Sequence, residues 1–176
     1  APRRPSSKEG KLTDAAPSRD DLVLVLAPTG RDMPLTCALL TEHAHVACEP
    51  CNSVPDLCAK IRQGAGIAII AQEALEPAGV RALTDVLGEQ LPWSDLPLLI
   101  LTNSPEISGG IISALRQRGN ITVLDRPLRI VTLISAVQSG LRARRRQYQV
   151  RDLLEETRRA VTQRDQFLAM LGHELR

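Results

Sequence analysis

The sequence predicts an α/β protein in which parallel strands alternate with helices and one long C-terminal helix follows. Short apolar runs of strand length recur along residues 21–140, separated by helical segments of about ten residues. Beyond residue 130 no proline interrupts a stretch rich in Arg, Gln, Leu and Glu, which favours an unbroken helix. Right-handed crossovers between five such strands give a doubly wound sheet with the strand order 2-1-3-4-5.

The composition limits how this fold can be built. A chain of 176 residues with 43% apolar content can bury one core of ordinary size. Its three aromatic residues are Trp93, Tyr148 and Phe167, so the core consists of aliphatic side chains and offers no stacking platform for single-stranded nucleic acid. Residues 21–140 contain eight basic and twelve acidic side chains, whereas residues 141–176 contain nine and five. The basic charge therefore belongs to the C-terminal helix.

The N-terminal residues 1–20 mix Pro, Ser, Lys, Arg and Asp without an apolar period, which predicts a flexible basic tail. No apolar run approaches the roughly 18 to 20 residues that a membrane-spanning helix needs. The N-terminus also lacks the apolar region of a signal peptide. We therefore expect a cytoplasmic protein without a membrane span.

The predicted elements begin directly after this tail. Leu22–Ala27 is a continuous apolar run, as expected for a parallel strand covered on both faces. The spacing of Leu35, Leu39 and Leu40 predicts a helix over Met33–His43. The other expected elements are a strand around Val46–Cys48, a helix at Pro55–Gln63, a strand at Gly66–Ala71, a helix at Val80–Leu91, a strand at Leu96–Thr102, a helix at Ile107–Arg118, a strand at Ile121–Leu124 and a helix from Ile130 onward.

This layout resembles a response-regulator receiver domain, with its flavodoxin-like sheet, over residues 21–140. The resemblance implies a phosphorylatable aspartate ending the third strand, an acidic pair after the first strand and a lysine after the fifth. The corresponding positions here hold Ala71, Ala27-Pro28 and Arg126, with Thr102 ending the fourth strand. Without a carboxylate nucleophile or an oxygen cage for a hard divalent cation, no acyl phosphate can form. We therefore expect a phosphorylation-silent pseudo-receiver.

Two nearby carboxylates leave an alternative open. Asp32 or Glu73 could partly substitute for the missing acid, which would make the domain a true receiver with displaced acids. Otherwise they are carboxylates placed near the positive end of a helix dipole. Arg126 is expected to pair with a surface carboxylate such as Asp125 or Asp32.

The long helix carries an apolar seam with a period of 3.5 residues, which is typical of a coiled coil. Polar Thr157 and Arg164 interrupt this seam, whereas Leu153 and Ala160 widen it. We therefore predict a marginal or register-shiftable parallel dimer through residues 141–176. One series of the seam is Leu154, Val161, Leu168 and Leu175, and its companion series is Val150, Thr157, Arg164 and Leu171.

The C-terminal stretch Gln166–Arg176 places one histidine on an amphipathic helix. His173 lies about 200° around the helix from both Leu171 and Leu175, so it projects from the opposite face. The sequence Phe-Leu-Ala-Met-Leu-Gly-His-Glu-Leu-Arg resembles the H-box of sensor histidine kinases, whose histidine accepts the γ-phosphoryl group of ATP. The resemblance implies that His173 is the phosphoacceptor and that Glu174 orients its imidazole. An imidazole nitrogen is nucleophilic only when neutral, and an adjacent carboxylate can hold the other ring nitrogen as a donor.

The kinase resemblance implies the N-terminal regulatory part of a two-component sensor kinase. Nothing in the 176 residues resembles the glycine-rich ATP-binding domain, so ATP and Mg²⁺ are expected only for the full-length kinase and no cofactor is expected in this chain. The expected partners are a second copy through the C-terminal helix, a protein on the pseudo-receiver and, for the full-length kinase, a cognate response regulator. The alternative is a non-catalytic dimeric scaffold in which the His-Glu pair is incidental.

The cysteines raise the question of a metal site. They crowd into one region, which fits reduced thiols better than a disulfide framework. Such thiols and imidazoles could bind zinc, but small apolar residues are also what the inner faces of the predicted helices need. We favour structural thiols. The residues concerned are Cys37, Cys48, Cys51, Cys58, His43 and His45.

Two remaining motifs are given structural interpretations. Arg142, Arg144, Arg145 and Arg146 could contact phosphates, but no base-reading set accompanies them. We therefore predict a solvated helix segment and no nucleic-acid partner. Gly64-Ala-Gly66 precedes a strand, the wrong side for a phosphate-cradling loop, and is predicted to be a turn.

Overall fold

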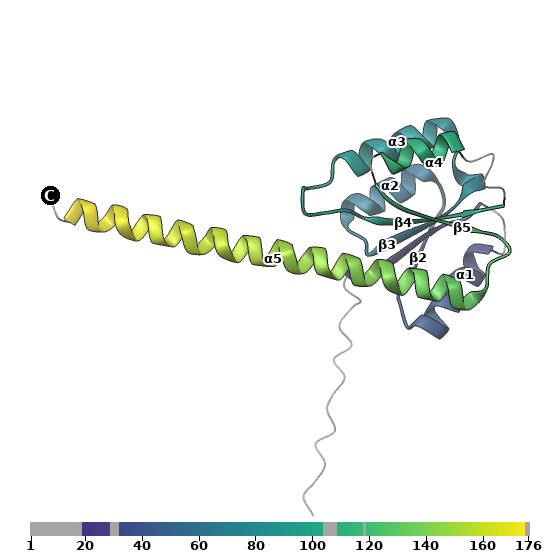
Figure 1. Cartoon of the computed structure of the whole chain (residues 1–176), viewed down its shortest axis with the longest axis horizontal. Coiled ribbons are helices and arrows are strands. Elements are labelled where there is room, and N and C mark those ends of the chain that lie inside the picture. The colour runs from purple at the N-terminus through teal and green to yellow at the C-terminus, as the bar shows by residue number, and fades with distance from the viewer. Residues whose placement is uncertain (1–18, 29–31, 104–108, 118, 175–176) are drawn as a thin grey trace, which may run out of the picture.

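A computed structural model of the chain describes residues 19–28, 32–103, 109–117 and 119–174. It contains a parallel sheet with helices on both faces and one helix that runs far beyond the sheet (Figure 1). The strand order β2-β1-β3-β4-β5 confirms the predicted order 2-1-3-4-5. The strands are β1 (Val23–Leu26), β2 (Cys48–Cys51), β3 (Ile67–Ala71), β4 (Pro97–Thr102) and β5 (Asn120–Asp125). The helices are α1 (Asp32–Ala44), α2 (Val54–Gln63), α3 (Pro77–Gly88), α4 (Gly109–Arg116) and α5 (Ile130–Glu174), with short 3-10 turns η1 (Arg19–Asp21) and η2 (Gln72–Ala74).

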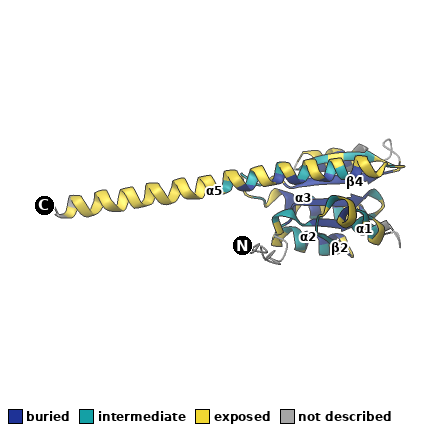
Figure 2. Cartoon of the chain, turned by 90° about the horizontal axis from the view of Figure 1, so that it is seen from below, coloured by how far each residue is buried: buried dark blue, intermediate teal, exposed yellow. Residues whose placement is uncertain are grey.

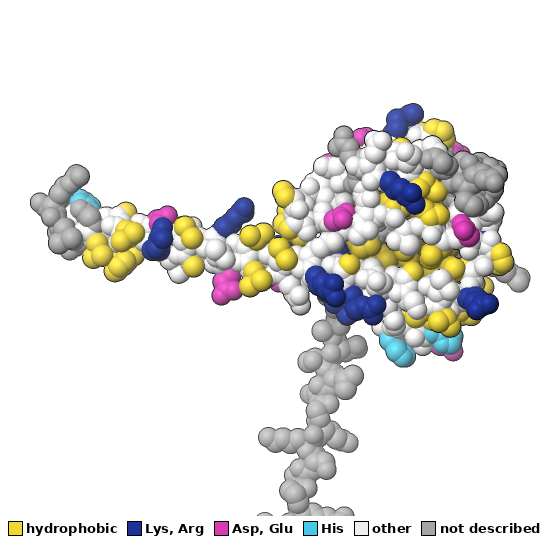
Figure 3. Space-filling model, viewed as in Figure 1, with side chains coloured by type: hydrophobic (Ala, Val, Ile, Leu, Met, Phe, Trp, Pro, Cys, Tyr) yellow, Lys and Arg dark blue, Asp and Glu magenta, His cyan; other side chains and the backbone are white. Residues whose placement is uncertain are grey.

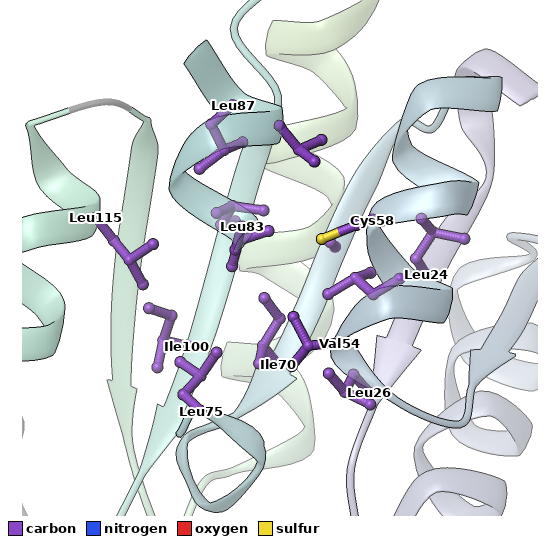
Figure 4. Close-up of a cluster of buried hydrophobic side chains, with 14 of the residues drawn as sticks. Leu24, Leu26, Val54, Cys58, Ile70, Leu75, Leu83, Leu87, Ile100 and Leu115 are labelled. Atoms are coloured by element: carbon purple, nitrogen blue, oxygen red, sulfur yellow. The ribbon is translucent and has the colours of Figure 1, made fainter. Parts of the chain in front are cut away.

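The three inner strands, β1, β3 and β4, are buried along their whole length, because helices cover both faces of the sheet. Side chains alternate between two cores, so Leu24 and Ile70 meet residues from α2, α3 and α4 such as Leu83 (Figure 4). Burying a leucine or isoleucine of this kind contributes about 1.5–3 kcal/mol. The continuous apolar runs in the sequence therefore reflect a two-sided core.

The opposite face of the sheet is covered by α1 and the first part of α5. Leu133, Val137 and Leu141 of α5 pack against β-strand residues that include Ile67. Gly140 allows this close approach, because a Cβ there would overlap the Ile67 side chain and touch Pro97. The start of α5 is thus an integral part of the domain core.

Beyond the sheet, α5 continues without covering. Its last buried residue is Tyr148, and every residue from Asp152 to Leu171 is exposed (Figure 2). The helix has 45 residues, which corresponds to roughly 68 Å. The prediction of one unbroken helix from Ile130 is confirmed up to Glu174, and Leu175 and Arg176 lie outside the described residues.

Several predicted boundaries were wrong. The second strand is Cys48–Cys51 instead of Val46–Cys48, and Pro50 pairs in register with Val25. A proline is tolerated there because β2 is an edge strand, and the sequence Cys-Glu-Pro-Cys gave no strand signal. The third helix spans Pro77–Gly88 instead of Val80–Leu91, because a proline can begin a helix in its first turn.

The other boundaries agree within one or two residues where they can be compared. The turn predicted at Gly64 is confirmed, since Gly64 ends α2 with a φ of 107° and its N–H donates to the Ile61 carbonyl at 3.0 Å. The flexible tail was predicted for residues 1–20, but its last two residues, Arg19 and Asp20, belong to η1. Residues 1–18 and the predicted start of the fourth helix at Ile107 lie outside the described residues. No helix in the described ranges is long and apolar enough to cross a membrane.

Candidate functional site

The carboxyl ends of the inner strands lie at one edge of the sheet, where the sequence predicted the degenerate receiver site. Ala71 ends β3 and Thr102 ends β4, and both are buried. Arg126 follows β5, and its backbone N–H donates to the Thr102 carbonyl at 2.7 Å. The structure therefore brings these residues to neighbouring strands at the same edge, as the resemblance implied.

Side chains of η2 contact this edge from the end of β3. The Thr102 hydroxyl donates to the Gln72 side-chain carbonyl. The carboxylate of Glu73 accepts from the Asn103 amide at 2.7 Å and from the Arg126 guanidinium at 3.3 Å. Glu73 is thus engaged by a cation and an amide donor.

Arg126 pairs with a partly exposed carboxylate, as expected, but this carboxylate is Glu73, which the prediction did not name. η2 turns the chain directly after β3, which brings Glu73 across β4 to Arg126. The sequence contains no indication of this pair, because the two residues are 53 positions apart. Both side chains are partly exposed, so the ion pair contributes at most about 1 kcal/mol. The side chain of Asp32 lies outside what the structure describes.

The cysteines lie on α1, α2 and β2. Burial raises the pKa of the Cys48 thiol to about 12, helped by the neighbouring Cys37, and burial raises the pKa of Cys51 to about 11. A protonated thiol is a poor metal ligand and a poor nucleophile. Within the described ranges no three His, Cys, Asp or Glu side chains gather as they would around a metal ion.

His173 lies near the end of α5. Its imidazole is exposed and makes no hydrogen bond or ion pair with any residue that the structure describes. The side chain of Glu174 lies outside the described side chains. The geometry leaves the His173 ring accessible to an incoming group.

The predicted seam lies along the projecting part of α5. Its apolar members are between 40% and 55% exposed, and Figure 3 shows hydrophobic side chains gathered along this part of the helix. Thr157 and Arg164 are satisfied within their own helix, through the Leu153 carbonyl and Asp165 respectively. Of the seam positions, Leu175 lies outside the described residues. The exposed apolar members are Val150, Leu154, Val161, Leu168 and Leu171.

Arg144 corrects the prediction that the arginine run is a solvated segment. It is only 5% exposed, and its guanidinium donates to the Ala65 carbonyl at 3.2 Å and to the Ser94 hydroxyl at 2.8 Å. It also donates to the Gln147 side-chain carbonyl at 2.7 Å. The spacing Leu141, Arg144, Tyr148 already placed Arg144 on the sheet-facing side of the helix, a signal that the charge of the run obscured.

Two aromatic rings lie beside this arginine. The rings of Trp93 and Tyr148 have their centroids 5.6 Å apart. The Arg144 guanidinium lies 4.7 Å from the Tyr148 centroid and 5.8 Å from that of Trp93. Arg151 lies 4.8 Å and 5.4 Å from the same two centroids. We call Trp93, Arg144, Tyr148 and Arg151 the exit cluster, because they lie where α5 leaves the domain.

Comparisons with known proteins bear on the fold. No protein-family model matches the chain, and no curated protein matches it either. Among solved structures, NtrX from Brucella abortus in complex with ADP is 17% identical with a TM-score of 0.59, over 77% of this chain and 29% of that one. The chain thus spans less than a third of that protein's length.

Two further structures match over most of their own length. The CheY-like receiver domain protein from Methanospirillum hungatei JF-1 is 15% identical with a TM-score of 0.55, over 72% of this chain and 97% of that one. A yeast Spc42 trimeric coiled coil fused to another protein is 14% identical with a TM-score of 0.58, over 90% of this chain and 98% of that one. The part of the chain that forms the sheet and its covering helices therefore adopts a receiver-like α/β fold, and a long C-terminal helix extends it.

Proposed function

We propose that the chain is the regulatory part of a two-component histidine kinase, in which a phosphorylation-silent receiver-like domain controls a dimeric helix that presents His173. The observation that carries this proposal is the continuity of α5, which begins on the sheet at Ile130 and includes the exposed His173 near its end. A continuous helix transmits a rotation or shift from one end to the other. The domain can thereby bias how the histidine is presented.

The exposed seam supports pairing of two such helices. Apolar side chains at Leu154, Val161 and Leu168 are left in water by a single chain, and each contributes about 1.5–3 kcal/mol when fully buried. Thr157 and Arg164 lower that gain, so the pair is held weakly enough to change register. Two registers of similar energy are what a signal from the domain needs in order to select one.

The receiver-like edge supports the silent role. Ala71 has no nucleophilic atom, and the Glu73 carboxylate is held by Asn103 and Arg126. The input to this domain is therefore a protein partner or a second copy instead of a phosphoryl group. The domain acts by contact.

The chemistry at the other end requires a neutral imidazole. ATP held by the catalytic domain of the kinase would supply the phosphoryl group. The ring nitrogen of His173 that carries the free lone pair would form a bond to the γ-phosphorus, the bond from that phosphorus to the β,γ-bridging oxygen would break, and ADP would leave, while Glu174 holds the second ring nitrogen as a donor. This division of labour gives the chain the acceptor and leaves nucleotide binding to another domain.

Phosphoryl transfer in trans tests the proposal. The chain is incubated with a separately purified histidine-kinase ATP-binding domain, Mg²⁺ and γ-labelled ATP. We expect label on the wild-type chain and on His43→Ala, which removes an exposed histidine at the end of α1, but none on His173→Ala. Equal label on His173→Ala, or no label on the wild-type chain, contradicts the proposal.

A second candidate function is a non-catalytic dimeric scaffold. The observation that favours it is that the exposed apolar seam offers a pairing surface that does not include His173. The coding sequence after Arg176 discriminates between the two. An Asn-Pro pair and a second amphipathic helix support the kinase, whereas a stop codon or an unrelated linker supports the scaffold.

A further inference from the structure

The exit cluster uses two of the three aromatic residues in the whole chain. Trp93 comes from the connection between α3 and β4, and Tyr148 comes from α5 at its last buried turn. An otherwise aliphatic protein thus concentrates its aromatic surface at the point where a long helix separates from the sheet. The point of separation determines the direction of everything that follows along α5.

Arg144 is an unusual side chain to bury at such a point. Its hydrogen bonds to Ala65, Ser94 and Gln147 all have neutral acceptors: a backbone carbonyl, a hydroxyl and an amide oxygen. The Asp20 carboxylate lines the same pocket and interacts with Tyr148. Taking a guanidinium out of water costs free energy that neutral acceptors and aromatic faces only partly return. A leucine at this position would cover the sheet at a lower cost, so the arginine provides geometric specificity in addition to burial.

That specificity follows from the shape of the guanidinium. Its donors point in fixed directions within one plane, so its hydrogen bonds to Ala65 and Ser94 form together only over a narrow range of helix rotation and height. The aliphatic contacts of Leu133 and Val137 are non-directional and tolerate small shifts. Arg144 therefore selects one docking position among several that the aliphatic core allows.

Neighbouring contacts hold the same segment. Gln147 pairs twice with the backbone of Asp95, donating at 2.8 Å and accepting at 2.9 Å, and Arg145 donates to the Asp21 carboxylate at 2.7 Å. A pocket of 390 Å³ borders the exit cluster, with Trp93, Tyr148 and Arg151 in its lining. The side chains of the exit cluster therefore have space to rearrange when the contacts between its arginines and its aromatic rings are lost.

The projecting helix amplifies any change at the cluster. From Arg151 to His173 the helix extends about 33 Å, so a tilt of about 10° at the cluster moves His173 by about 6 Å. A displacement of that size is larger than the distance over which a reacting atom must be positioned.

We propose that the exit cluster is the joint that fixes the direction and rotational phase of α5, with Arg144 as a positioning residue for His173. The consequence at His173 rests on the proposed function, whereas the joint itself concerns only the geometry of α5. Opening the joint uncouples the projecting helix from the sheet domain while leaving both folded.

Distance measurements on the full chain test the joint. Spin labels are attached through non-natural ketone residues at Arg81 on the exposed face of α3 and at Gln163 on α5, so the native thiols stay unmodified. Excess unlabelled chain ensures that each dimer carries one labelled copy. We expect a narrow distance distribution for the wild type and for Arg142→Gln, which removes an exposed arginine two positions away, and a distribution at least twofold broader for Arg144→Gln.

A second variant protects the test against loss of folding. Arg151→Gln removes the partly exposed cation beside Trp93 and Tyr148, together with its ion pair to Asp152, and leaves the hydrogen bonds of Arg144 in place. We expect intermediate broadening with unchanged circular dichroism. If the distance distributions of Arg151→Gln and of folded Arg144→Gln are as narrow as that of Arg142→Gln, the proposal that the exit cluster fixes the direction of α5 is wrong.

Phosphoryl transfer to His173 from γ-labelled ATP, with the separate ATP-binding domain, then tests the positioning role of Arg144 independently of the distance measurements. We expect the labelling rate of Arg144→Gln to differ at least threefold from that of Arg142→Gln. Equal rates together with a broadened distribution overturn the positioning role. Absence of label on every variant contradicts the proposed function, and the distance distributions still decide whether the joint exists.

Discussion

Arg144 and Glu73 owe their roles to partners that lie far away in the sequence. Arg144 bonds to Ala65 across 79 positions, and Glu73 bonds to Arg126 across 53. In both cases the sequence context is misleading, since Arg144 stands in a basic run and Glu73 follows a buried strand. At the residue scale, the topology of the sheet determines which charged side chains find a partner in the protein and which remain solvated.

The receiver-like edge gives the first prediction at the residue scale. Beryllofluoride with Mg²⁺ mimics an acyl phosphate on a reactive aspartate, and position 71 is an alanine. We expect no change in melting temperature or in oligomeric state when the chain is incubated with the two reagents. A receiver domain with its aspartate intact, treated in parallel, verifies the reagents, and a shift in this chain would favour a true receiver with displaced acids.

The start of α2 gives a pH prediction. The backbone N–H of Asn52 donates to the Asp56 carboxylate at 2.9 Å and, together with Lys60, lowers the pKa of that carboxyl below its usual 3.8. A lowered pKa means that the stabilisation is present above pH 3.8 and is lost as the pH falls through the folded-state value.

We therefore expect the free energy of unfolding to fall less steeply below pH 4 in Asp56→Asn than in the wild type. Urea unfolding at about four pH values between pH 2.5 and 6 measures how steeply the free energy of unfolding changes with pH. Asp85→Asn, the same exchange of a carboxyl for an amide on the exposed face of α3, serves as the matched control. An unchanged slope in Asp56→Asn would show that this carboxylate gains nothing from its contacts.

At the scale of the element, α5 uses different faces along its length. Leu133, Val137 and Leu141 face the sheet, whereas Val150 and Leu154 lie on a face that no described residue covers. The exposed face continues in register to Leu171, which is what a partner helix would require. The helix thus joins a docked half to an unpartnered half.

Substitutions on the unpartnered face give a prediction for assembly. We expect Leu154→Gln and Leu168→Gln each to weaken self-association by roughly 10- to 100-fold, because each removes about 1.5–3 kcal/mol of apolar burial. Met170→Gln changes an exposed apolar residue on the other side of the helix and should have little effect. Sedimentation equilibrium measures the constants, and equal weakening by all three variants would exclude this seam.

The polar interruptions allow the opposite test. We expect Thr157→Val combined with Arg164→Leu to strengthen self-association by at least tenfold, because it completes the apolar seam. The same double variant should reduce the number of registers that the helix pair populates. Disulfide cross-linking of cysteines introduced along the seam reports the register. Unchanged association would place the partner on another face.

At the scale of the whole molecule, the docking of α5 on the sheet depends on one glycine. Gly140→Ala inserts a Cβ against Ile67 and Pro97, which forces the helix away from the sheet. We expect a destabilisation of about 1–3 kcal/mol from overpacking, reduced by up to about 1 kcal/mol from the better helix propensity of alanine. Chemical denaturation measures the net effect.

Gly110→Ala in α4 is the matched control, since a Cβ there meets nothing within 4 Å. The gain in helix propensity should make that variant neutral or slightly more stable. A Gly140→Ala protein as stable as Gly110→Ala would mean that the sheet and α5 adjust to each other more freely than their packing implies.

Much of the fold could be predicted from local pattern. Leu22–Ala27, Gly66–Ala71 and Leu96–Thr102 are apolar runs too short for helices and match β1, β3 and β4 within one residue at each end. The edge strand β2 could not be predicted as well, because Pro50 resembles a turn residue and only pairing with Val25 makes it a strand. The positions of Ala71, Thr102 and Arg126 at one edge of the sheet could be predicted, but the contacts of that edge with Gln72 and Glu73 could not.

The sequence by itself determined the alternation of strands and helices, the unbroken length of α5 and the presence of an apolar seam, because each depends on residues within a few turns or one strand. Tertiary structure alone decided that Arg126 pairs with Glu73, that β2 begins at Cys48 and that Arg144 is buried beside Trp93 and Tyr148. The physical reason is that the burial of a charged side chain, or the pairing of an edge strand, depends on which distant residues the sheet brings into contact with it. The periodicity of the sequence reports only on neighbours along the chain.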